Sequence, residues 1–241
     1  MFEEFIQSPA GRAIAAVVIS ALAILIIDLN YRWFFKRVFD IVFSLIAILI
    51  CSPLFFAGVI ISAGRGDEIT EKTPYLGKGG KIVFLRSFAG MEKGIKNLPR
   101  LIDILCGNMS FAGVAPMALS DGAFMDDNAM ERFTVRPAVF NHLALRADEN
   151  MTYEEMFALD ARYAKRRELF TDIFIVIKSL VLAIRGERKS YLGEVKDGTY
   201  AQTLLKRGEI TEEDILNAEK AAAEALEEYE KRKKVKKQKY N

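Results

Sequence analysis

Two long apolar runs near the start of the chain dominate its pattern of hydrophobic and polar positions. The first, residues 13–27, holds no charged side chain, and the window 9–29 reaches the length of about 20 residues that a spanning helix needs. A cleaved signal peptide is the alternative. The segment before the run holds Glu3, Glu4 and no basic residue, and no small-residue cleavage site follows the run. We therefore expect a retained transmembrane helix within residues 1–32.

The second apolar run covers residues 38–63 and has a Ser-Pro pair at residues 52–53. Proline removes a backbone donor and clashes with the preceding turn, so the helix should kink there. Two interpretations stay open: a kinked spanning helix, and a re-entrant hairpin that enters and leaves the membrane on one face. Basic residues at both ends, Lys36 and Arg37 before the run and Arg65 after it, favour the hairpin. The same bias places the body after the first run in the cytoplasm.

The rest of the chain alternates short elements with turns. In residues 74–88, three glycines mark a turn and a β-rich stretch follows, so a short β-hairpin is expected. A helix is expected from Asn97, which can cap it, to Gly107, which can end it. Its apolar stripe would be the set Leu98, Leu101, Ile102 and Leu105.

Three further helices are predicted downstream. Thr152 and Glu155 form a capping box at the start of one helix. Residues 173–184 are strongly apolar, and both a membrane-interface helix and a packed core helix fit them. A charged amphipathic surface helix should begin at Thr211, with five residues at heptad-like spacing along one face. These residues are Ile215, Ala218, Ala222, Ala225 and Tyr229.

Charge and composition exclude several classes of protein. The chain holds 34 basic and 32 acidic residues, and its last eleven residues hold seven Lys or Arg and no acid. The basic character is therefore local, which argues against a nucleic-acid-binding body. That basic end has two open interpretations: a contact with anionic lipid headgroups and a solvated disordered end. Cys51, Cys106 and His142 form no metal-ligand or disulfide pattern.

Three separated segments carry the most distinctive motifs of the chain. The first, residues 36–55, holds Lys36, Arg37, Asp40, Ser44, Ser52 and Pro53. The second is the apolar frame of residues 98–110, and the third, residues 152–180, holds Leu159, Asp160, Tyr163, Asp172, Ile173, Lys178 and Leu180. At these positions the chain resembles the bacterial sugar transferases, monotopic membrane enzymes that place a sugar phosphate on a polyprenyl phosphate carrier.

The resemblance and the patterns together predict a mostly α fold with a short β-hairpin. Residues 1–32 would be the N-terminal transmembrane helix, and residues 33–184 the sugar transferase-like domain. The first part of that domain would be a re-entrant helix (33–63), kinked at Ser52 and Pro53, with Lys36 and Arg37 at the membrane interface. The second part would be a compact cytoplasmic α-rich body (64–184) with amphipathic interfacial helices. Residues 185–241 would form a helical basic extension. The expected location is the bacterial inner membrane, with the body on its cytoplasmic face.

The resemblance also implies which positions would carry the chemistry. In the family an Asp attacks the pyrophosphate of a nucleotide sugar, and the neighbouring Glu helps to hold Mg²⁺. A carboxylate suits both tasks because it is a nucleophile at neutral pH and a hard oxygen ligand. The corresponding positions here hold Lys96 and Asn97. A protonated lysine repels Mg²⁺ and has no lone pair for attack, so Mg²⁺ is expected only if the chain is active.

Two other carboxylates are candidate substitutes for this dyad. Glu92 lies in a loop that is shorter than the family's. Asp103 lies two helical turns after Lys96, about 10 Å away along the helix, which is too far to inherit the dyad's geometry. Arg86 and Arg136 are the candidate phosphate ligands, since an arginine can hold a phosphate through two hydrogen bonds.

Further phosphate ligands of the family are replaced. Ala115 stands where the family has an Arg that meets phosphate, and Asp148 stands where another Arg is usual. A change from Arg to Asp repels a nucleotide phosphate. The nucleophile, the metal ligand and two phosphate ligands of the family are therefore all replaced in this chain.

Three hypotheses about function follow. The first is a membrane-bound relative that has lost catalysis and acts as a partner or scaffold in exopolysaccharide or glycoconjugate assembly. Its partners would be membrane lipid and an active sugar transferase paralogue or other glycan-assembly protein, in a homo- or heterodimer, without nucleic acid. The second is an active, divergent phosphoglycosyl transferase that uses a relocated carboxylate and Mg²⁺. The third is a membrane adaptor whose function lies in the tail.

Overall fold

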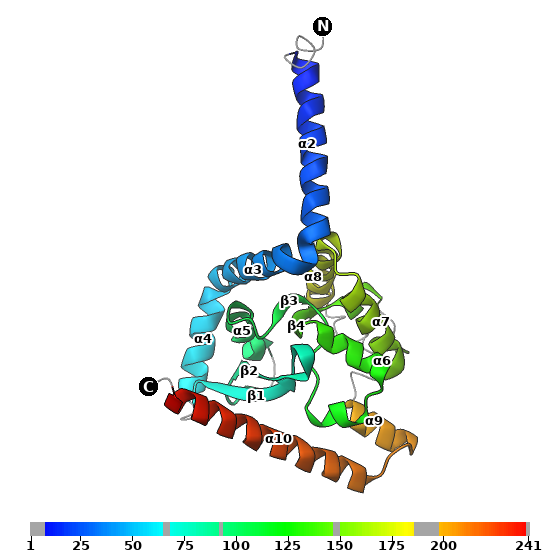
Figure 1. Cartoon of the computed structure of the whole chain (residues 1–241). Coiled ribbons are helices and arrows are strands. Elements are labelled where there is room, and N and C mark those ends of the chain that lie inside the picture. Colours follow the sequence, from blue (N-terminus) through cyan, green and yellow to red (C-terminus); the bar gives the residue numbers. More distant parts are fainter. Residues whose placement is uncertain (1–7, 65–67, 92–93, 147–149, 186–197, 240–241) are drawn as a thin grey trace.

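The protein is described by a computed structural model, which covers residues 8–64, 68–91, 94–146, 150–185 and 198–239. Arg65, Glu92, Asp148 and the start of the predicted C-terminal extension lie outside these residues. The described residues are mostly helical, as predicted, with two small sheets (Figure 1). The N-terminal helix projects from a body built from all the other elements (Figure 1).

The projecting helix α2 spans Pro9–Asn30. Its stretch Pro9–Ile27 has a mean hydropathy of 2.4 and is long and apolar enough to cross a membrane. Only 6% of that stretch is buried against the rest of the chain. The predicted apolar helix is confirmed as a helix, and its outer surface has no protein partner in the described residues that would account for its hydrophobicity.

The second apolar run forms two helices, α3 (Lys36–Ile50) and α4 (Ser52–Ala63), joined at Cys51 and bent by 69°. The predicted kink is confirmed: Pro53 lies in the first turn of α4, where its missing N–H costs nothing. A π-helical turn, Tyr31–Phe35, connects α2 to α3. Gly58 lets α4 approach the body closely, because a Cβ at this position would lie 2.3 Å from the Phe88 ring.

The predicted hairpin is present as β1 (Thr70–Leu76) and β2 (Ile82–Phe88), paired antiparallel. Its turn contains Gly79 and Gly80 at φ values of 72° and 68°, a conformation that favours glycine. A second sheet was not predicted: β3 (Ser110–Gly113) and β4 (Ala138–Asn141) pair in parallel. Strands of four residues are too short to give a recognisable alternation.

The helix expected from Asn97 is shorter than predicted. Asn97 ends a 3₁₀ turn, and α5 covers only Arg100–Leu105, with Pro99 rather than Asn97 at its N-cap. The predicted stripe is also partly wrong: α5 buries Leu101, Asp103 and Ile104, while Ile102 is exposed. Because Asp103 is buried, α5 presents a different face to the body from the one that its apolar residues predict. The expected stop at Gly107 is confirmed, with φ at 85°.

The remaining helices are α6 (Asp127–Met130), α7 (Tyr153–Lys165), α8 (Leu169–Ile184), α9 (Tyr200–Arg207) and α10 (Glu212–Lys239). Of these, α7, α8 and α10 correspond to the three predicted helices, and α6 and α9 were not predicted. The capping box of Thr152 and Glu155 at the start of α7 is confirmed. The start of α10 after Thr211 is confirmed too, and α10 crosses the end of the body away from α2 (Figure 1).

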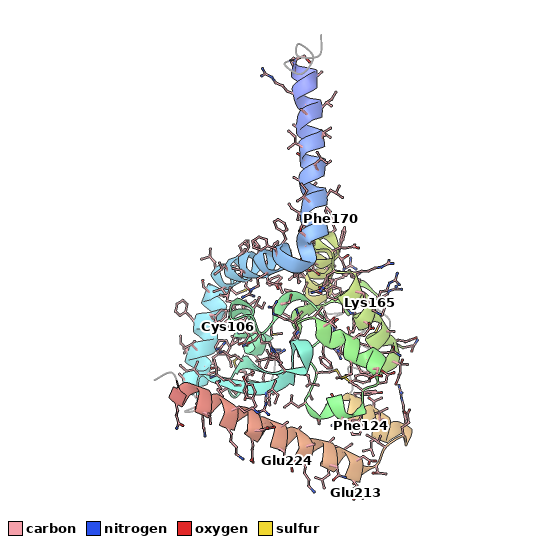
Figure 2. All side chains as sticks on the ribbon, in the orientation of Figure 1. Cys106, Phe124, Lys165, Phe170, Glu213 and Glu224 are labelled. Atoms are coloured by element: carbon pink, nitrogen blue, oxygen red, sulfur yellow. The ribbon has the colours of Figure 1, made fainter. Side chains whose placement is uncertain are left out.

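Helix α8 has two different faces. Ile175, Val176 and Leu182 are buried in the body, whereas an outer apolar face is exposed. That face consists of Phe170, Phe174, Ile177, Leu180, Val181 and Ile184. Phe170 lies at the end of the body from which α2 projects (Figure 2). The packed-core interpretation is therefore confirmed for the inner face, and the membrane-interface interpretation stays a prediction for the outer face.

Candidate functional site

A buried cluster of polar side chains joins the start of α3 to the body. Asp172 on α8 is its centre: its carboxylate accepts hydrogen bonds from Lys36 Nζ at 2.5 Å, Tyr31 Oη at 2.5 Å and Tyr163 Oη at 2.6 Å. Lys36 Nζ also lies 3.4 Å from Asp40 Oδ1. Tyr31, Lys36, Asp40, Tyr163 and Asp172 are all buried and are called the anchor cluster below.

The pKa shifts of the two tyrosines in the anchor cluster agree with the hydrogen bonds that they donate. Burial raises the pKa of Tyr31 and of Tyr163, and the neighbouring negative charge of Asp172 raises both further. Both phenols therefore stay protonated and donate to Asp172. Lys36 completes its bonding by donating to the Ala112 carbonyl oxygen at 2.8 Å. The cluster ties α3 to α8 and β3.

The two residues predicted at the membrane interface both contact the body. Lys36 is buried in the anchor cluster. Arg37 donates to the last carbonyl oxygens of α5, those of Ile104 at 2.6 Å and Leu105 at 2.8 Å. A cation at a helix C-terminus is stabilised by the free carbonyl groups there. The first turn of α3 is thus held by α5 and α8.

The predicted phosphate ligand Arg136 lies in a basic hollow beside the anchor cluster. Lys36, Lys78 and Arg167 line the same small cavity of about 20 Å³. Burial lowers the pKa of Lys78, and the positive charges of Arg136 and Arg167 lower it further. Asp40 lines the same cavity, and Lys36 is paired with Asp172, so these cations are partly balanced. The hollow itself has room for about one water molecule.

At the position that corresponds to the family's dyad, Lys96 forms an ion pair with Glu71 on β1. The Nζ–Oε1 distance is 3.1 Å, and the hydroxyl of Ser87 donates to the same oxygen at 2.9 Å. These hydrogen bonds from Lys96 and Ser87 lower the pKa of Glu71. Asn97 is exposed. The nearby carboxylate is therefore held by an ammonium group.

The predicted residues Arg86 and Asp103 bind each other. Asp103 is fully buried, and its carboxylate accepts the backbone N–H of Arg86 at 2.6 Å and the Arg86 side-chain Nη1 at 2.5 Å. Burial raises the pKa of Asp103, and the contacts with Arg86 oppose that rise. The candidate substitute carboxylate thus points inward, and the candidate phosphate ligand is partly neutralised.

These residues do not fit Mg²⁺. The ion prefers several oxygen ligands in octahedral geometry. In residues 8–64, 68–91, 94–146, 150–185 and 198–239, no three His, Cys, Asp or Glu side chains gather in a way that could hold a metal ion. Glu71 is engaged by Lys96 and Ser87, and Asp103 by Arg86. No catalytic step through Mg²⁺ follows from this arrangement.

His142 belongs to a second buried ionic group. Its Nε2 lies 2.7 Å from Asp160 Oδ1, and Arg132 Nη2 lies 2.9 Å from the other oxygen of that carboxylate. Arg132 also donates to the carbonyl oxygen of Ala115 at 2.7 Å, so the segment with Ala115 is held through its backbone. This group packs α7 against the 131–145 region. His142 is 6% exposed.

Sequence reasoning missed Glu71, Ser87, Lys78 and Arg167 as members of these groups. Ser87 stood next to a predicted site residue, and Lys78 lay in the glycine-rich turn. Nothing in the polar stretch around Glu71 distinguishes it from its neighbours. Its partner Lys96 comes from a different element, so only the fold shows the pairing.

Comparison with known proteins gives concordant matches. Residues 92–186 match the family described as bacterial sugar transferase. The chain is similar to the galactosyl transferase CpsE of Streptococcus agalactiae serotype III (strain NEM316), with 25% identity over 117 residues, 48% of this chain and 24% of that protein. It is also similar to the exopolysaccharide production protein ExoY of Rhizobium meliloti (strain 1021), with 23% identity over 189 residues, 60% of this chain and 83% of that protein. The matched part thus spans about a quarter of CpsE.

Proposed function

Because the chain belongs to the bacterial sugar transferase family, we propose that it acts in exopolysaccharide or glycoconjugate assembly without phosphoglycosyl transferase activity of its own. Its role would be that of a membrane-bound partner or scaffold, most simply for an active sugar transferase paralogue. The observation that carries this proposal is the Lys96–Glu71 ion pair at the position corresponding to the family's dyad.

The chemistry of that position supports the proposal. Transfer of a sugar phosphate in this family needs a free carboxylate nucleophile and a second carboxylate for the metal. Lys96 is paired with Glu71 and neutralises its charge, and an ammonium group offers no lone pair for attack. Asp103 is buried behind Arg86, out of reach of a substrate.

The proposed membrane arrangement rests on where the bent pair α3–α4 is attached. Arg37, at the start of α3, donates to the end of α5. Ser62, at the end of α4, donates to the carbonyl oxygen of Ala89 at 3.0 Å. Since both ends of the pair bond to the same body, the pair returns to the side of the membrane from which it entered. This supports a re-entrant helix, with the body on the cytoplasmic face and α2 crossing the membrane.

The exposed apolar side chains fit the same arrangement. The outer sides of α3 and α4 and the outer face of α8 are apolar and exposed, and an apolar surface of this extent marks a membrane or protein contact. On α3 and α4 these residues are Val38, Val42, Phe43, Leu45, Ile46, Leu49, Ile50, Leu54, Phe56, Ile60 and Ile61. We propose that they face lipid.

Cysteine labelling tests the topology. Two variants with a single cysteine each are compared. In Cys51→Ser, the remaining exposed Cys106 reports on which side of the membrane the body lies. In Ser8→Cys/Cys51→Ser/Cys106→Ser, the cysteine at position 8 reports on which side the start of α2 lies. A membrane-impermeant maleimide added to intact spheroplasts should label position 8 and leave Cys106 unlabelled until the cells are opened. Equal labelling of both positions in intact spheroplasts would contradict the re-entrant arrangement, because a spanning α3–α4 places both on one side.

A turnover assay tests the proposed loss of catalysis. The purified full chain in lipid nanodiscs is incubated with uridine diphosphate sugars, Mg²⁺ and undecaprenyl phosphate, beside an active sugar transferase prepared identically. We expect uridine monophosphate release equal to that of empty nanodiscs. Release above that background would overturn the proposal in favour of the divergent active enzyme. Activity that survives Asp103→Asn would then exclude Asp103 as the relocated carboxylate.

A further inference from the structure

A cavity of about 730 Å³ lies between the β1–β2 hairpin and helix α10. The hairpin contributes Lys72, Phe84 and Arg86 to its lining, and the helix contributes Tyr229, Lys233 and Lys234. Its volume is in the range typical of sites for small molecules, about 300–1,000 Å³. The helix residues lie beyond residue 186, where the match to the sugar transferase family ends. The α10 side of this cavity therefore lies outside the matched family region.

Two aromatic rings form the contact between the helix and the hairpin. The ring centroids of Phe84 and Tyr229 lie 5.8 Å apart with an interplanar angle of 44°, within the range of favourable aromatic pairs. Both side chains are only partly buried and both line the cavity. Planar, π-rich groups stack on such side chains irrespective of their exact identity.

The basic residues of α10 divide into two sets. Lys231 and Arg232 form ion pairs along the helix with Glu227 and Glu228, at 3.4 Å and 2.7 Å. Lys233 and Lys234 line the cavity instead. Within the part of the chain that the structure describes, neither of these two lysines has an ion pair. The helix thus directs its uncompensated charge toward the hairpin.

The hairpin meets these lysines with further positive charge. Lys72 also has no ion pair among the described residues, and Arg86 lies directly across from it in the strand register. Four cations line the cavity against Glu230 and against Asp103, which holds Arg86. Four positive charges less two negative charges leave a surplus of two. An anion of two charges between the hairpin and α10 would relieve this repulsion.

We propose that this cavity binds a small organic phosphate that carries an aromatic ring, the chemistry of a nucleoside monophosphate. The phosphate lies among Lys72, Lys233 and Lys234, which act as cationic donors. The ring stacks beside Phe84 and Tyr229. Because the ligand contacts both elements, it holds α10 against the hairpin, so the ligand and the C-terminal helix dock together.

This site is separate from the Lys96–Glu71 pair. Successive residues of a strand point to opposite faces, and Glu71 pairs with Ser87 across the hairpin while Lys72 pairs with Arg86. The cavity and the position corresponding to the family's dyad therefore lie on different faces of the hairpin. Ligand binding in the cavity and sugar transfer at the dyad position are measured separately, so the failure of one experiment does not decide the other.

Isothermal titration calorimetry on the full chain in nanodiscs tests the proposal. The probes are uridine monophosphate and adenosine monophosphate, compared with uridine and with inorganic phosphate. Saturable binding of a nucleoside monophosphate, tighter than that of uridine or phosphate alone, is the expected result. Absence of saturable nucleotide binding overturns the proposal, and equal binding of inorganic phosphate overturns the role of the aromatic pair.

Matched variants of α10 locate the binding. Lys233→Gln/Lys234→Gln should weaken nucleotide binding at least about tenfold, since each lysine supplies a charge-assisted hydrogen bond. Lys231→Gln/Arg232→Gln removes the same charge from the same helix and should change binding by less than about twofold, because its residues are paired elsewhere. If both variants weakened nucleotide binding equally, the effect would come from the net charge of the helix, and the proposed site would be overturned.

Hydrogen exchange supplies a second readout. Saturating nucleotide should slow amide exchange in the last turns of α10, around Tyr229, and should leave α7 unchanged. Tyr229→Ala should abolish this protection while α7 exchanges as in the unaltered chain. Protection that persists in Tyr229→Ala would contradict docking of the helix through the ligand.

Discussion

The anchor cluster and the Lys96–Glu71 pair place ionic groups in opposite environments. The side chains of Asp40 and Asp172 in the anchor cluster are 0% exposed, while those of Lys96 and Glu71 are 33% and 45% exposed. Breaking a buried pair leaves an uncompensated charge and costs several kcal/mol, whereas an exposed pair contributes about 0–1 kcal/mol. The attachment of α3 to the body is therefore constrained, and the pair at the position corresponding to the family's dyad is easily exchanged.

Under the proposed function, this difference would allow the family scaffold to persist without the family's chemistry. Lys36 and Asp172 serve the fold, because they join α3 to α8. A substitution at Asn97 alters an exposed position, and one at Lys96 alters a single partly exposed ion pair with Glu71. Selection for a membrane-bound partner would preserve the first group and place no demand on the second. The following predictions test the comparison, from the largest expected effect to the smallest.

Asp172→Ala should give the largest loss of stability. It leaves Lys36 without its closest partner and removes the acceptor of Tyr31 and Tyr163. We expect a loss of about 3–5 kcal/mol in the free energy of unfolding. Denaturant unfolding in a mild detergent measures it. The control is Glu131→Ala, which breaks the exposed pair with Lys165 and should cost less than about 1 kcal/mol. Equal losses in the two variants would remove the contrast.

Gly58→Ala should destabilise the attachment of α4. The added Cβ would lie 2.3 Å from the Phe88 ring, so the helix must shift. Overpacking of this kind costs about 1–3 kcal/mol. In a Phe88→Leu background the added methyl group has more room, and the penalty of Gly58→Ala should fall. A double-mutant cycle with thermal unfolding measures the coupling, and strictly additive effects would argue against close contact at this point.

Lys96→Gln should have the smallest effect, below about 1 kcal/mol at neutral pH. Because the pKa of Glu71 is lowered in the folded state, its stabilisation is present above the ordinary value of 4.5 and is lost as the pH falls through the lowered value. The stability difference between Lys96→Gln and the unaltered chain should therefore be constant from about pH 6 to 8 and shrink in acid. A difference that grows in acid would have the wrong sign for this pair.

Local signals in the sequence predicted much of the fold. The kink at Pro53, the glycine turn of the hairpin and the capping box at Thr152 each depend on residues a few positions apart. The start and the buried face of α5 were wrong, because Asp103 turns inward to meet Arg86 from another element. The parallel pairing of β3 and β4 also joins distant segments.

The candidate site was less predictable than the fold. The sequence indicated which positions correspond to the family's dyad, and it offered Asp103 and Arg86 as separate candidates. Their mutual ion pair is a long-range contact that no spacing rule gives. The same holds for Glu71 and Lys96. Which charges neutralise one another depends on the tertiary fold.

The α10 cavity extends the comparison to a third environment. Its lysines are exposed like Lys96, yet Lys233 and Lys234 have no ion pair in the described part of the chain. An exposed cation without a counterion is available to a ligand, whereas a paired one is not. The proposed nucleotide site and the proposed loss of catalysis thus follow from the same distinction between paired and uncompensated charge.

Intact-protein mass spectrometry tests the central claim most directly, because the family reaction passes through a covalent phosphosugar on a carboxylate. The full chain and an active sugar transferase are each incubated with uridine diphosphate sugars and Mg²⁺, without the lipid acceptor, and quenched in acid. We predict an unchanged mass for this chain and a phosphosugar adduct on the active enzyme. An adduct on this chain, mapped by peptide analysis to Glu92, Asp103 or any other carboxylate, would contradict the account.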